Sequence, residues 1–454
     1  SIEIGDDPMV PENWKFSDYP NFSFPPPEAV RDIKVEKGQV RRNNNEGNCV
    51  VGPDGKLWVI YRHFERSMGI FSATVFYDAK EDSQRFRNVY ERDPAKGQEN
   101  CYSDFPGACS GFHIAYDEKS GKYIALANPV TGETQYPDGK QLGIYRCMRN
   151  VLVMMESDDL VHWRMVKHLM KDEIETNWDE SVKRTGFQQV NFVIQGDDLI
   201  WVSRTAYDGA ENLHDANRIT FHRLRDFREY LNGDGTVAHY SFDNPTDLGR
   251  DTCKQAGPNG VGGNTLAHQG VEAATGEHGG AAAFRGKGAV LNGGSKLSVE
   301  LHRAETIILD TWVWFDEMPD GNDKIQLFDV SVHEGYVGIG LGVLNGNLTL
   351  AARSCRQDAC QFLRVPAPEL NAWHHITATV DFEGKTLVIK INGETVGAKD
   401  DADFAQDVFL RGIPTETDRI GLNLSGRLDA FHIHRTFTHK RTNKLPKEND
   451  PRKR

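Results

Sequence analysis

The sequence predicts an all-β protein of two consecutive domains, and three features support this. Short runs of β-branched and aromatic residues, such as 57–61 and 199–202, recur along the chain, whereas helix signals are scarce. Turn-forming segments such as Pro53-Asp54-Gly55 separate these runs. At 230–235 the sequence changes character, and Gly-rich and Trp-containing segments follow. We therefore expect one β domain over 1–231, a second over 236–438 and a basic tail over 439–454.

The first domain has the pattern of a β-propeller. Regularly spaced short strands with tight turns are typical of a sandwich, a barrel or a propeller. One propeller blade takes about 40–50 residues. The first 230 residues therefore hold about five blades, with six as the alternative.

Composition excludes some classes of function. Asp and Glu outnumber Lys and Arg by 66 to 53, which gives the 454 residues a formal net charge of -13. A protein that binds the phosphate backbone of nucleic acid needs a basic surface stripe. Here only the tail over 440–454 is basic, as a solvated chain end often is. No apolar run approaches the roughly 20 residues of a membrane span. The sequence also starts without Met or a signal peptide, as expected of a processed or trimmed chain.

The second domain resembles laminin-G and concanavalin A-like lectin domains, which are jelly-roll sandwiches. The resemblance covers about 200 residues and implies carbohydrate binding. We expect Trp312, Trp314 and Trp373 to alternate into the sandwich core, and Asn392-Gly393 to form a two-residue hairpin turn. The segments that carry the resemblance are Tyr240-Ser241-Phe242-Asp243, Phe284-Arg285-Gly286, Thr311-Trp312-Val313-Trp314-Phe315, Trp373-His374-His375, Asn392-Gly393 and Arg427-Leu428-Asp429.

The same resemblance implies a calcium site. In such domains an early Asp and a late Asp often approach each other at the sandwich edge, and Asp243 and Asp429 occupy those places here. Their hard oxygen ligands suit calcium, which would be structural. The alternative is that Asp429 merely holds a turn. No organic cofactor is expected.

The seven cysteines include two pairs spaced for small loop disulfides. These are Cys355 with Cys360 and Cys101 with Cys109. Such disulfides imply an oxidising compartment, so we expect a secreted, extracellular or cell-surface protein, with the periplasm as an alternative. The competing interpretation is buried free thiols.

Polar clusters lie at several predicted strand ends of the first domain. In a propeller the inner strands surround one axis, so residues at their ends can share one pocket. The plainer interpretation is that Asn, Asp and Gly form loops and that Arg pairs with acids. The clusters contain Arg42, Glu46, Arg149, Asn150, Gln188, Arg204, Tyr207, His214, Asp215 and Asn217.

These clusters follow the order found in the sialidase-like superfamily, which the chain resembles over roughly 35–228. The quoted motifs are Glu46-Gly47-Asn48, Arg149-Asn150, Ser157-x-Asp159-Leu160-x-x-Trp163, Gly186-Phe187-Gln188, Ser203-Arg204-Thr205-Ala206 and His214-Asp215-Ala216-Asn217. The Ser157–Trp163 motif resembles the turn of glycosidase propellers, in which Asp accepts backbone N–H groups and Trp packs beneath. We expect this motif to be structural. It lacks the Gly and Thr that precede the Trp of a sialidase Asp-box.

A glycosidase site can be assembled from the clustered residues. Glycosyl transfer needs an acid and a second carboxylate or Tyr at the anomeric carbon. Asp215 and Glu46 are the candidate acids, Tyr207 is the alternative nucleophile, and His214 could act as acid/base or orient Asp215. Arg binds a sugar carboxylate bidentately. The substrate-binding candidates are therefore Arg42, Arg149 and Arg204, with Asn150, Asn217 and Gln188.

We accordingly predict a glycoside hydrolase acting on an acidic glycan, with the sandwich as its carbohydrate-binding module. The partner would be a poly- or oligosaccharide, and self-assembly is also compatible with the sequence. Two alternatives stay open. One is a polysaccharide lyase, in which His or Tyr removes a proton beside a uronate carboxylate that Arg neutralises. The other is a non-catalytic glycan-binding or surface-assembly protein.

Overall fold

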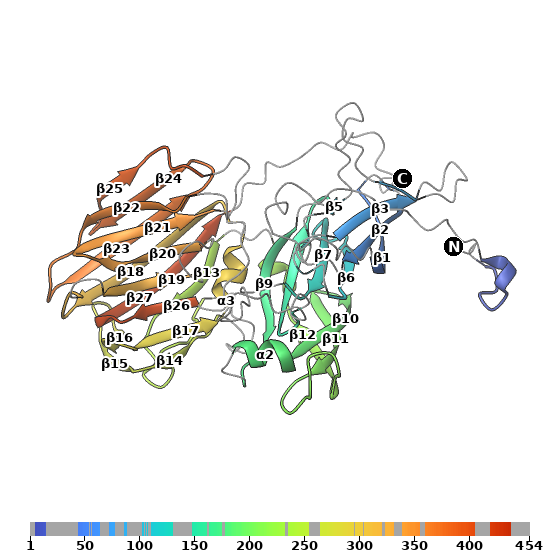
Figure 1. Ribbon diagram of the computed structural model, residues 1–454, viewed down its shortest axis with the longest axis horizontal. Coiled ribbons are helices and arrows are strands. Elements are labelled where there is room, and N and C mark those ends of the chain that lie inside the picture. The colour runs from blue at the N-terminus through green and yellow to red at the C-terminus, as the bar shows by residue number, and fades with distance from the viewer. Residues whose placement is uncertain are drawn as a thin grey trace, which may run out of the picture.

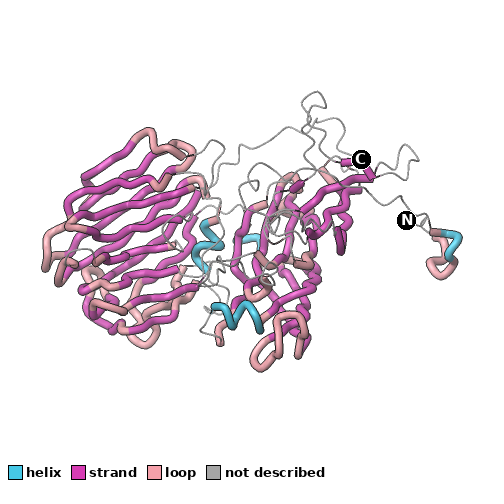
Figure 2. Tube along the Cα trace, in the orientation of Figure 1, coloured by secondary structure: helices cyan, strands magenta, loops and turns pink. Residues whose placement is uncertain are grey.

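The structure is a computed structural model of the chain. It describes residues 5–14, 44–53, 55, 57–63, 72–77, 86–88, 102–103, 105, 107, 110–129, 148–160, 163–174, 178–231, 235–253, 264–294, 296–302, 304–319, 323–330, 338–354, 359–404 and 418–436. Strands dominate these residues (Figures 1 and 2). The all-β prediction is therefore confirmed. No described helix is long and apolar enough to cross a membrane.

The first half contains three antiparallel sheets that follow one another along the chain. In each sheet the strands run mainly in sequence order, as in a meander. The first sheet has β1 (Asn44–Val51), β2 (Leu57–His63), β3 (Ser72–Tyr77), β4 (Phe86–Asn88) and β5 (Tyr102–Ser103). The second has β6 (His113–Asp117), β7 (Lys122–Ala127), β8 (Val151–Ser157) and β9 (Arg164–Lys171). The third has β10 (Gly186–Gln195), β11 (Asp198–Ala206) and β12 (Arg218–Leu224).

These sheets resemble propeller blades in connectivity, but they form no closed ring among the described residues. Three sheets are seen there, rather than the five or six that the sequence predicted. Their cores are continuous from sheet to sheet. Phe187 and Trp201 of the third sheet pack with Leu126 and Met154 of the second. Trp58 of the first sheet shares another cluster with the second.

The Ser157–Trp163 turn packs as a structural element, as predicted. Trp163 is fully buried, and its Nε1 donates to Leu160 O at 3.1 Å. Ser157 Oγ accepts the backbone N–H groups of Asp159 and Leu160, at 3.2 and 2.9 Å, and lies 3.1 Å from Asp159 Oδ1. The motif therefore closes the β8–β9 connection over the core.

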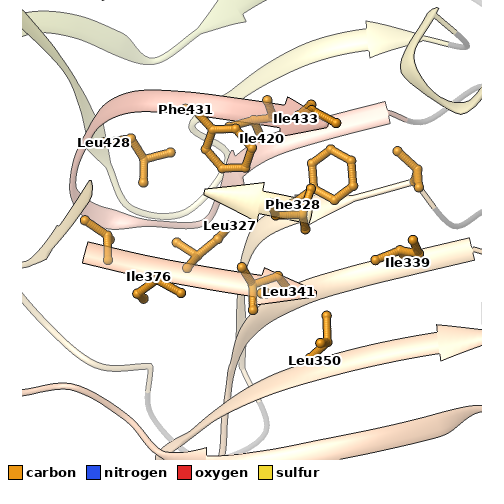
Figure 3. Packing of buried hydrophobic residues seen from close by; sticks show 14 of the residues in the cluster. Leu327, Phe328, Ile339, Leu341, Leu350, Ile376, Ile420, Leu428, Phe431 and Ile433 are labelled. Carbon is orange, nitrogen blue, oxygen red and sulfur yellow. The ribbon is translucent and has the colours of Figure 1, made fainter. Parts of the chain in front are cut away.

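The second half is a sandwich of two antiparallel sheets. The larger sheet contains β13 (Gly235–Tyr240), β15 (Val271–Thr275), β16 (Gly280–Arg285), β27 (Ser425–Thr436), β18 (Thr306–Phe315), β23 (Trp373–Asp381), β24 (Thr386–Ile391) and β25 (Glu394–Lys399). The other contains β14 (Ala267–Gln269), β17 (Val290–Gly294), β26 (Asp418–Leu422), β19 (Lys324–Asp329), β20 (Gly338–Leu344), β21 (Asn347–Arg353) and β22 (Gln361–Pro366). Figure 3 shows side chains from both sheets meeting in one core, among them Leu341 and Ile376.

The predicted burial of the tryptophans is wrong. Along β18 the buried residues alternate with half-buried ones, and the buried set includes Val313 and Phe315. Because successive side chains of a strand point to opposite faces, Trp312 and Trp314 lie on the outer face of the sheet. Trp373 is likewise half-buried on β23. The predicted Asn392-Gly393 turn is present between β24 and β25, with φ values of 53° and 84° that suit a two-residue hairpin.

The two halves are joined by buried contacts. Helix α3 (Lys296–Leu301) lies between the sandwich and β9 (Figure 1). Glu300 of α3 pairs with Lys167 of β9 at 3.1 Å, and both side chains are almost fully buried. Arg435 donates to Val166 O at 3.2 Å. A short helix, η5 (Phe227–Tyr230), ends the first half just before the predicted boundary.

Candidate functional site

A β-bulge in β10 places the predicted site residues. The pairing of β10 with β11 shifts register between Gln188 and Asn191, and Gln189 adopts a left-handed φ of 50°. A bulge leaves an extra residue unpaired and re-aims neighbouring side chains. Here it lets the side chains of Gln188 and Gln189 reach different neighbours.

Gln188 lies at the centre of a buried network. Its Oε1 accepts from the guanidinium groups of both Arg149 and Arg204, the latter at 3.0 Å. Its Nε2 donates to Leu213 O at 2.7 Å and His214 O at 3.0 Å. Because both ends of the amide are engaged, its orientation is fixed. The two arginines are thereby held to one point.

The backbone around this network is close-packed. Arg149 forms an isolated bridge with Gly186, the first residue of β10. A Cβ on Gly186 would lie 2.4 Å from Leu213 O, so the loop can approach only because a glycine stands there. Asn128, buried at the end of β7, donates to Val151 O and Phe187 O at 2.8 Å each. These bonds fix the ends of β7, β8 and β10 relative to one another.

The charge at the network is positive where the arginines meet. Among the described residues Arg204 has no carboxylate within ion-pair distance, and its buried Nε has no hydrogen-bond partner there. Gln188 is neutral, so it offers no compensating charge. Arg204 is half-buried, and partial burial of an Arg without an anion at ion-pair distance is unfavourable. The arrangement is therefore suited to receive an anionic group.

His214 and Asp215 lie beside the arginines in the β11–β12 loop. His214 Nδ1 lies 3.1 Å from Asp215 Oδ1, and Asn212 Nδ2 donates to Asp215 Oδ2 at 2.8 Å. The hydrogen bonds from Asn212 and His214 lower the pKa of the exposed Asp215 carboxyl, and the charge of Arg204 acts in the same direction. This shift favours the ionised form of Asp215, which suits an orienting group or a base.

Glu46 joins the same region from β1. Its Oε2 accepts from Arg62 and from Gln189 Nε2, the latter at 3.3 Å. Gly111, just before β6, allows this meeting, because a Cβ there would lie 3.0 Å from Glu46 Oε2. All three sheets of the first half thus contribute. We name the resulting set the Gln188 cluster, consisting of Glu46, Arg149, Gln188, Arg204, His214 and Asp215.

Three predicted residues do not belong to this cluster. Tyr207 packs near Phe187, on the opposite sheet face from Gln188. Burial raises the pKa of its hydroxyl, which opposes activation as a nucleophile. Asn217 closes the loop by bonding the backbone N and O of Tyr207. Asn150 is fully buried and donates to Ser181 Oγ at 3.0 Å.

Arg42 lies outside the described residues. Sequence reasoning missed Gln189, Asn128 and Asn212, which fix the cluster. Asn212 stands near the quoted His214-Asp215 motif, but nothing in the sequence marks the β10 bulge that gives Gln189 its role.

The predicted calcium pair is brought together at one hairpin. Asp429 Oδ2 accepts from His278 N at 2.8 Å, and Asp243 Oδ1 accepts from Gly280 N at 2.9 Å. Burial raises the pKa of the Asp429 carboxyl, and the nearby charge of Asp243 adds to this.

These hydrogen bonds fit the alternative in which Asp429 holds a turn. The described residues offer this carboxylate pair but no group of three or more His, Cys, Asp or Glu side chains placed to hold a metal. Calcium takes 6–8 oxygen ligands, so main-chain oxygens or water would have to supply the rest. The calcium site stays a proposal.

The disulfides also stay predictions. Cys355, Cys101 and Cys109 lie outside the described residues. Among the described cysteines, Cys49, Cys253 and Cys360 are present as thiols, so the structure does not contain the predicted Cys355–Cys360 bond, which rests on the sequence spacing alone.

Comparison with known proteins identifies no family. No family model and no curated protein matches the chain. Domain 4 of AbnA, a GH43 extracellular arabinanase from Geobacillus stearothermophilus solved with arabinotriose, is 19% identical with a TM-score of 0.34, covering 45% of this chain and 94% of that one. The binding domain of Paraclostridial Mosquitocidal Protein 1 is 16% identical with a TM-score of 0.33, covering 45% and 50%. The receptor-binding domain of a botulinum neurotoxin C/D mosaic serotype is 14% identical with a TM-score of 0.34, covering 45% and 48%. The chain thus spans about half the length of the toxin structures it matches.

Proposed function

We propose that the chain binds an acidic glycan at the Gln188 cluster. The observation that supports this most is the convergence of Arg149 and Arg204 on the single neutral oxygen of Gln188. A uronate carboxylate or a sulfate ester would place an anion within ion-pair distance of Arg204, where the described residues place none. The charge of Asp215 acts on Arg204 only from beyond that distance. Arginine forms paired hydrogen bonds with such groups.

Preorganisation supports the same proposal. Gln188 is held by two carbonyl oxygens of the 213–214 segment, and Arg204 is held by Gln188. Side chains fixed before binding lose little entropy when a ligand arrives. The site is also half open, because His214 and Asp215 are exposed while Gln188 is buried.

The experiment is affinity electrophoresis of the full chain through gels containing polygalacturonate, alginate or the neutral polysaccharide arabinan. We expect retardation by an acidic polymer that weakens as salt rises. Arg204→Gln should weaken it by about tenfold or more, as expected when a charge-assisted bond is lost. Arg223→Gln is the matched control, because Arg223 lies on the neighbouring strand but is already paired with Asp198. Equal loss in both variants, or no retardation of the folded wild type, would count against the proposal.

A lyase is the second candidate function, favoured by the His214–Asp215 contact. With Nδ1–H donated to Asp215, Nε2 of the exposed His214 is free to accept a proton. It would take the proton beside the uronate carboxylate while Arg204 stabilises the developing charge. The C–O bond to the leaving sugar breaks, a C=C bond forms, and solvent returns a proton to the departing oxygen.

Hydrolysis, which the sequence favoured, needs a protonated acid near neutral pH. Within the Gln188 cluster, the pKa of Asp215 is lowered and Glu46 is paired with Arg62. Product analysis separates the three functions. A lyase yields new reducing ends together with unsaturated non-reducing ends that absorb in the ultraviolet. A hydrolase yields new reducing ends without this absorbance, and a binder yields neither.

Two other sequence predictions accompany this proposal. The three meanders would be blades of a sialidase-like propeller, which a crystal structure of the chain would test. The protein would be secreted or displayed at the cell surface, which fractionation of the producing cells would test.

A further inference from the structure

The outer face of the larger sandwich sheet carries an unexpected set of ring side chains. Trp312 and Trp314 of β18 and Trp373 of β23 are half-buried there, on the face opposite the core. Strand register aligns them in two rows, with Trp314 opposite Trp373 and Trp312 opposite His375. The three residues are therefore only partly covered, on two strands that lie inside the sheet and not at its edges.

The first row is an aromatic pair braced by an arginine. Trp314 and Trp373 meet edge to face with ring centroids 5.9 Å apart. Arg427 of β27 lies over both rings, 4.5 Å from the centroid of Trp314 and 5.8 Å from that of Trp373. The indole N–H of Trp314 donates to Asp316 at 2.8 Å. These contacts hold the two indoles in fixed positions.

The second row places hydrogen-bonding groups beside another ring. Trp312 stacks on His375 at 4.9 Å. His375 Nε2 lies 3.0 Å from Asp310 Oδ1, and Thr377 Oγ1 donates to Asp310 Oδ2 at 2.8 Å. Asp310 and Trp314 are four residues apart on one strand, which is about 13 Å. Rings and polar groups thus alternate over the length of a short oligosaccharide.

From this arrangement we propose a second binding site on the sandwich, for uncharged sugar residues. A sugar ring has an apolar C–H face that packs on aromatic rings and hydroxyl groups that need donors and acceptors at its edge. This face offers both. Its charges are balanced locally, because Arg427 lies 4.0 Å from Asp316, so it has no excess cation for an acidic sugar. In this it differs from the Gln188 cluster, and the inference does not depend on the function proposed for that cluster.

The test is isothermal titration of the full chain with arabinan, laminarin and hydroxyethylcellulose as neutral probes. We expect at least one neutral probe to bind with an affinity insensitive to salt, whereas binding of polygalacturonate at the Gln188 cluster weakens with salt. Trp314→Ala and Trp373→Ala should each reduce neutral-probe affinity by about tenfold or more while leaving polygalacturonate binding unchanged.

Phe362→Ala is the matched control, because Phe362 is a partly exposed ring on the other sheet that also carries a stacked Arg, 4.6 Å from its centroid. Asp310→Asn is a second test of the same site, for use if the Trp variants do not fold, because it keeps the size of the side chain. It should also weaken binding of the neutral probe. Unchanged affinity in folded Trp314→Ala and Asp310→Asn, or no neutral probe bound by the wild type, would overturn the proposal. If the wild type binds a neutral probe but not polygalacturonate, the proposal for the Gln188 cluster fails and the proposal for the sandwich is supported.

Discussion

Replacing Lys167 by Met should destabilise the protein strongly, because it breaks a buried ion pair between the two halves. Lys167 Nζ and Glu300 Oε1 are 3.1 Å apart, and the two side chains are only 4% and 3% exposed. Glu300 also accepts from His168 N at 3.2 Å, so one neutral donor would remain to it. Removing one partner of such a pair costs about 3–5 kcal/mol, since the other charge stays buried.

Urea unfolding followed by circular dichroism measures this cost. With an m value of about 3 kcal/mol/M, the urea concentration at the unfolding midpoint should be lower in Lys167→Met than in the wild type by roughly 1–2 M. Adding Glu300→Gln should restore most of the loss, because the carboxamide still accepts from His168 N and no charge stays unpaired. Lys183→Met is the control. Lys183 pairs with Glu180 at the surface, where such pairs contribute about 0–1 kcal/mol.

A shift of Lys167→Met no larger than that of Lys183→Met would refute this reasoning. It would mean that water reaches the pair and that the halves are not docked through α3. Two separate unfolding transitions in the wild type would contradict the docking in the same way.

Three further predictions concern other sites. Burial lowers the pKa of His432 to about 4, so between about pH 6.5 and 4 the unfolded chain binds a proton that the folded chain does not. Stability should therefore fall as pH drops through this window, by on the order of 1 kcal/mol because solvent screens the half-buried ring. His432→Phe should flatten the dependence measured by urea unfolding at each pH, and equal slopes in both proteins would contradict it. The melting temperature of the wild type should be higher with calcium than with a chelator, and Asp429→Asn should abolish this difference. An equal melting temperature of the wild type in both conditions would mean that Asp243 and Asp429 only hold the hairpin. Cys355 and Cys360 should resist alkylation until reduced, and mass spectrometry showing both alkylated without reductant would disprove the disulfide.

Much of the fold could be predicted from the sequence because strand signals are local. The runs at 57–61 and 199–202 fall within β2 and β11, and Asn392-Gly393 forms its hairpin. The face of a strand was harder to predict. In Thr311-Trp312-Val313-Trp314-Phe315 both alternating sets contain large apolar residues, so the pattern does not choose between them. Pairing with β23 and β27 buries Val313 and Phe315 and leaves the tryptophans outside.

The candidate site was predicted in its residue types more than in its geometry. Gln188 links Arg149, Arg204 and the His214 carbonyl, and Glu46 reaches the adjacent Gln189, whereas the shared catalytic pocket stays a prediction. Their roles depended on contacts that no local pattern specifies. The β10 bulge arises in the pairing of β10 with β11, and the Lys167–Glu300 pair joins residues 133 positions apart. Tyr207 follows the end of β11 and packs near Phe187, a contact that no local pattern specifies.

Titration with a defined acidic oligosaccharide tests the central claim most directly. The full chain would be titrated with an oligogalacturonate and with the same oligosaccharide after reduction of its carboxylates to alcohols, using wild type and Arg204→Gln. Recognition of the carboxylate by the Gln188 cluster predicts that the wild type binds the acidic form more tightly than the reduced form. The affinity for the acidic form should fall about tenfold or more in Arg204→Gln and change little in Arg223→Gln. Equal affinity for the acidic and reduced forms, or full affinity in Arg204→Gln, would contradict the account.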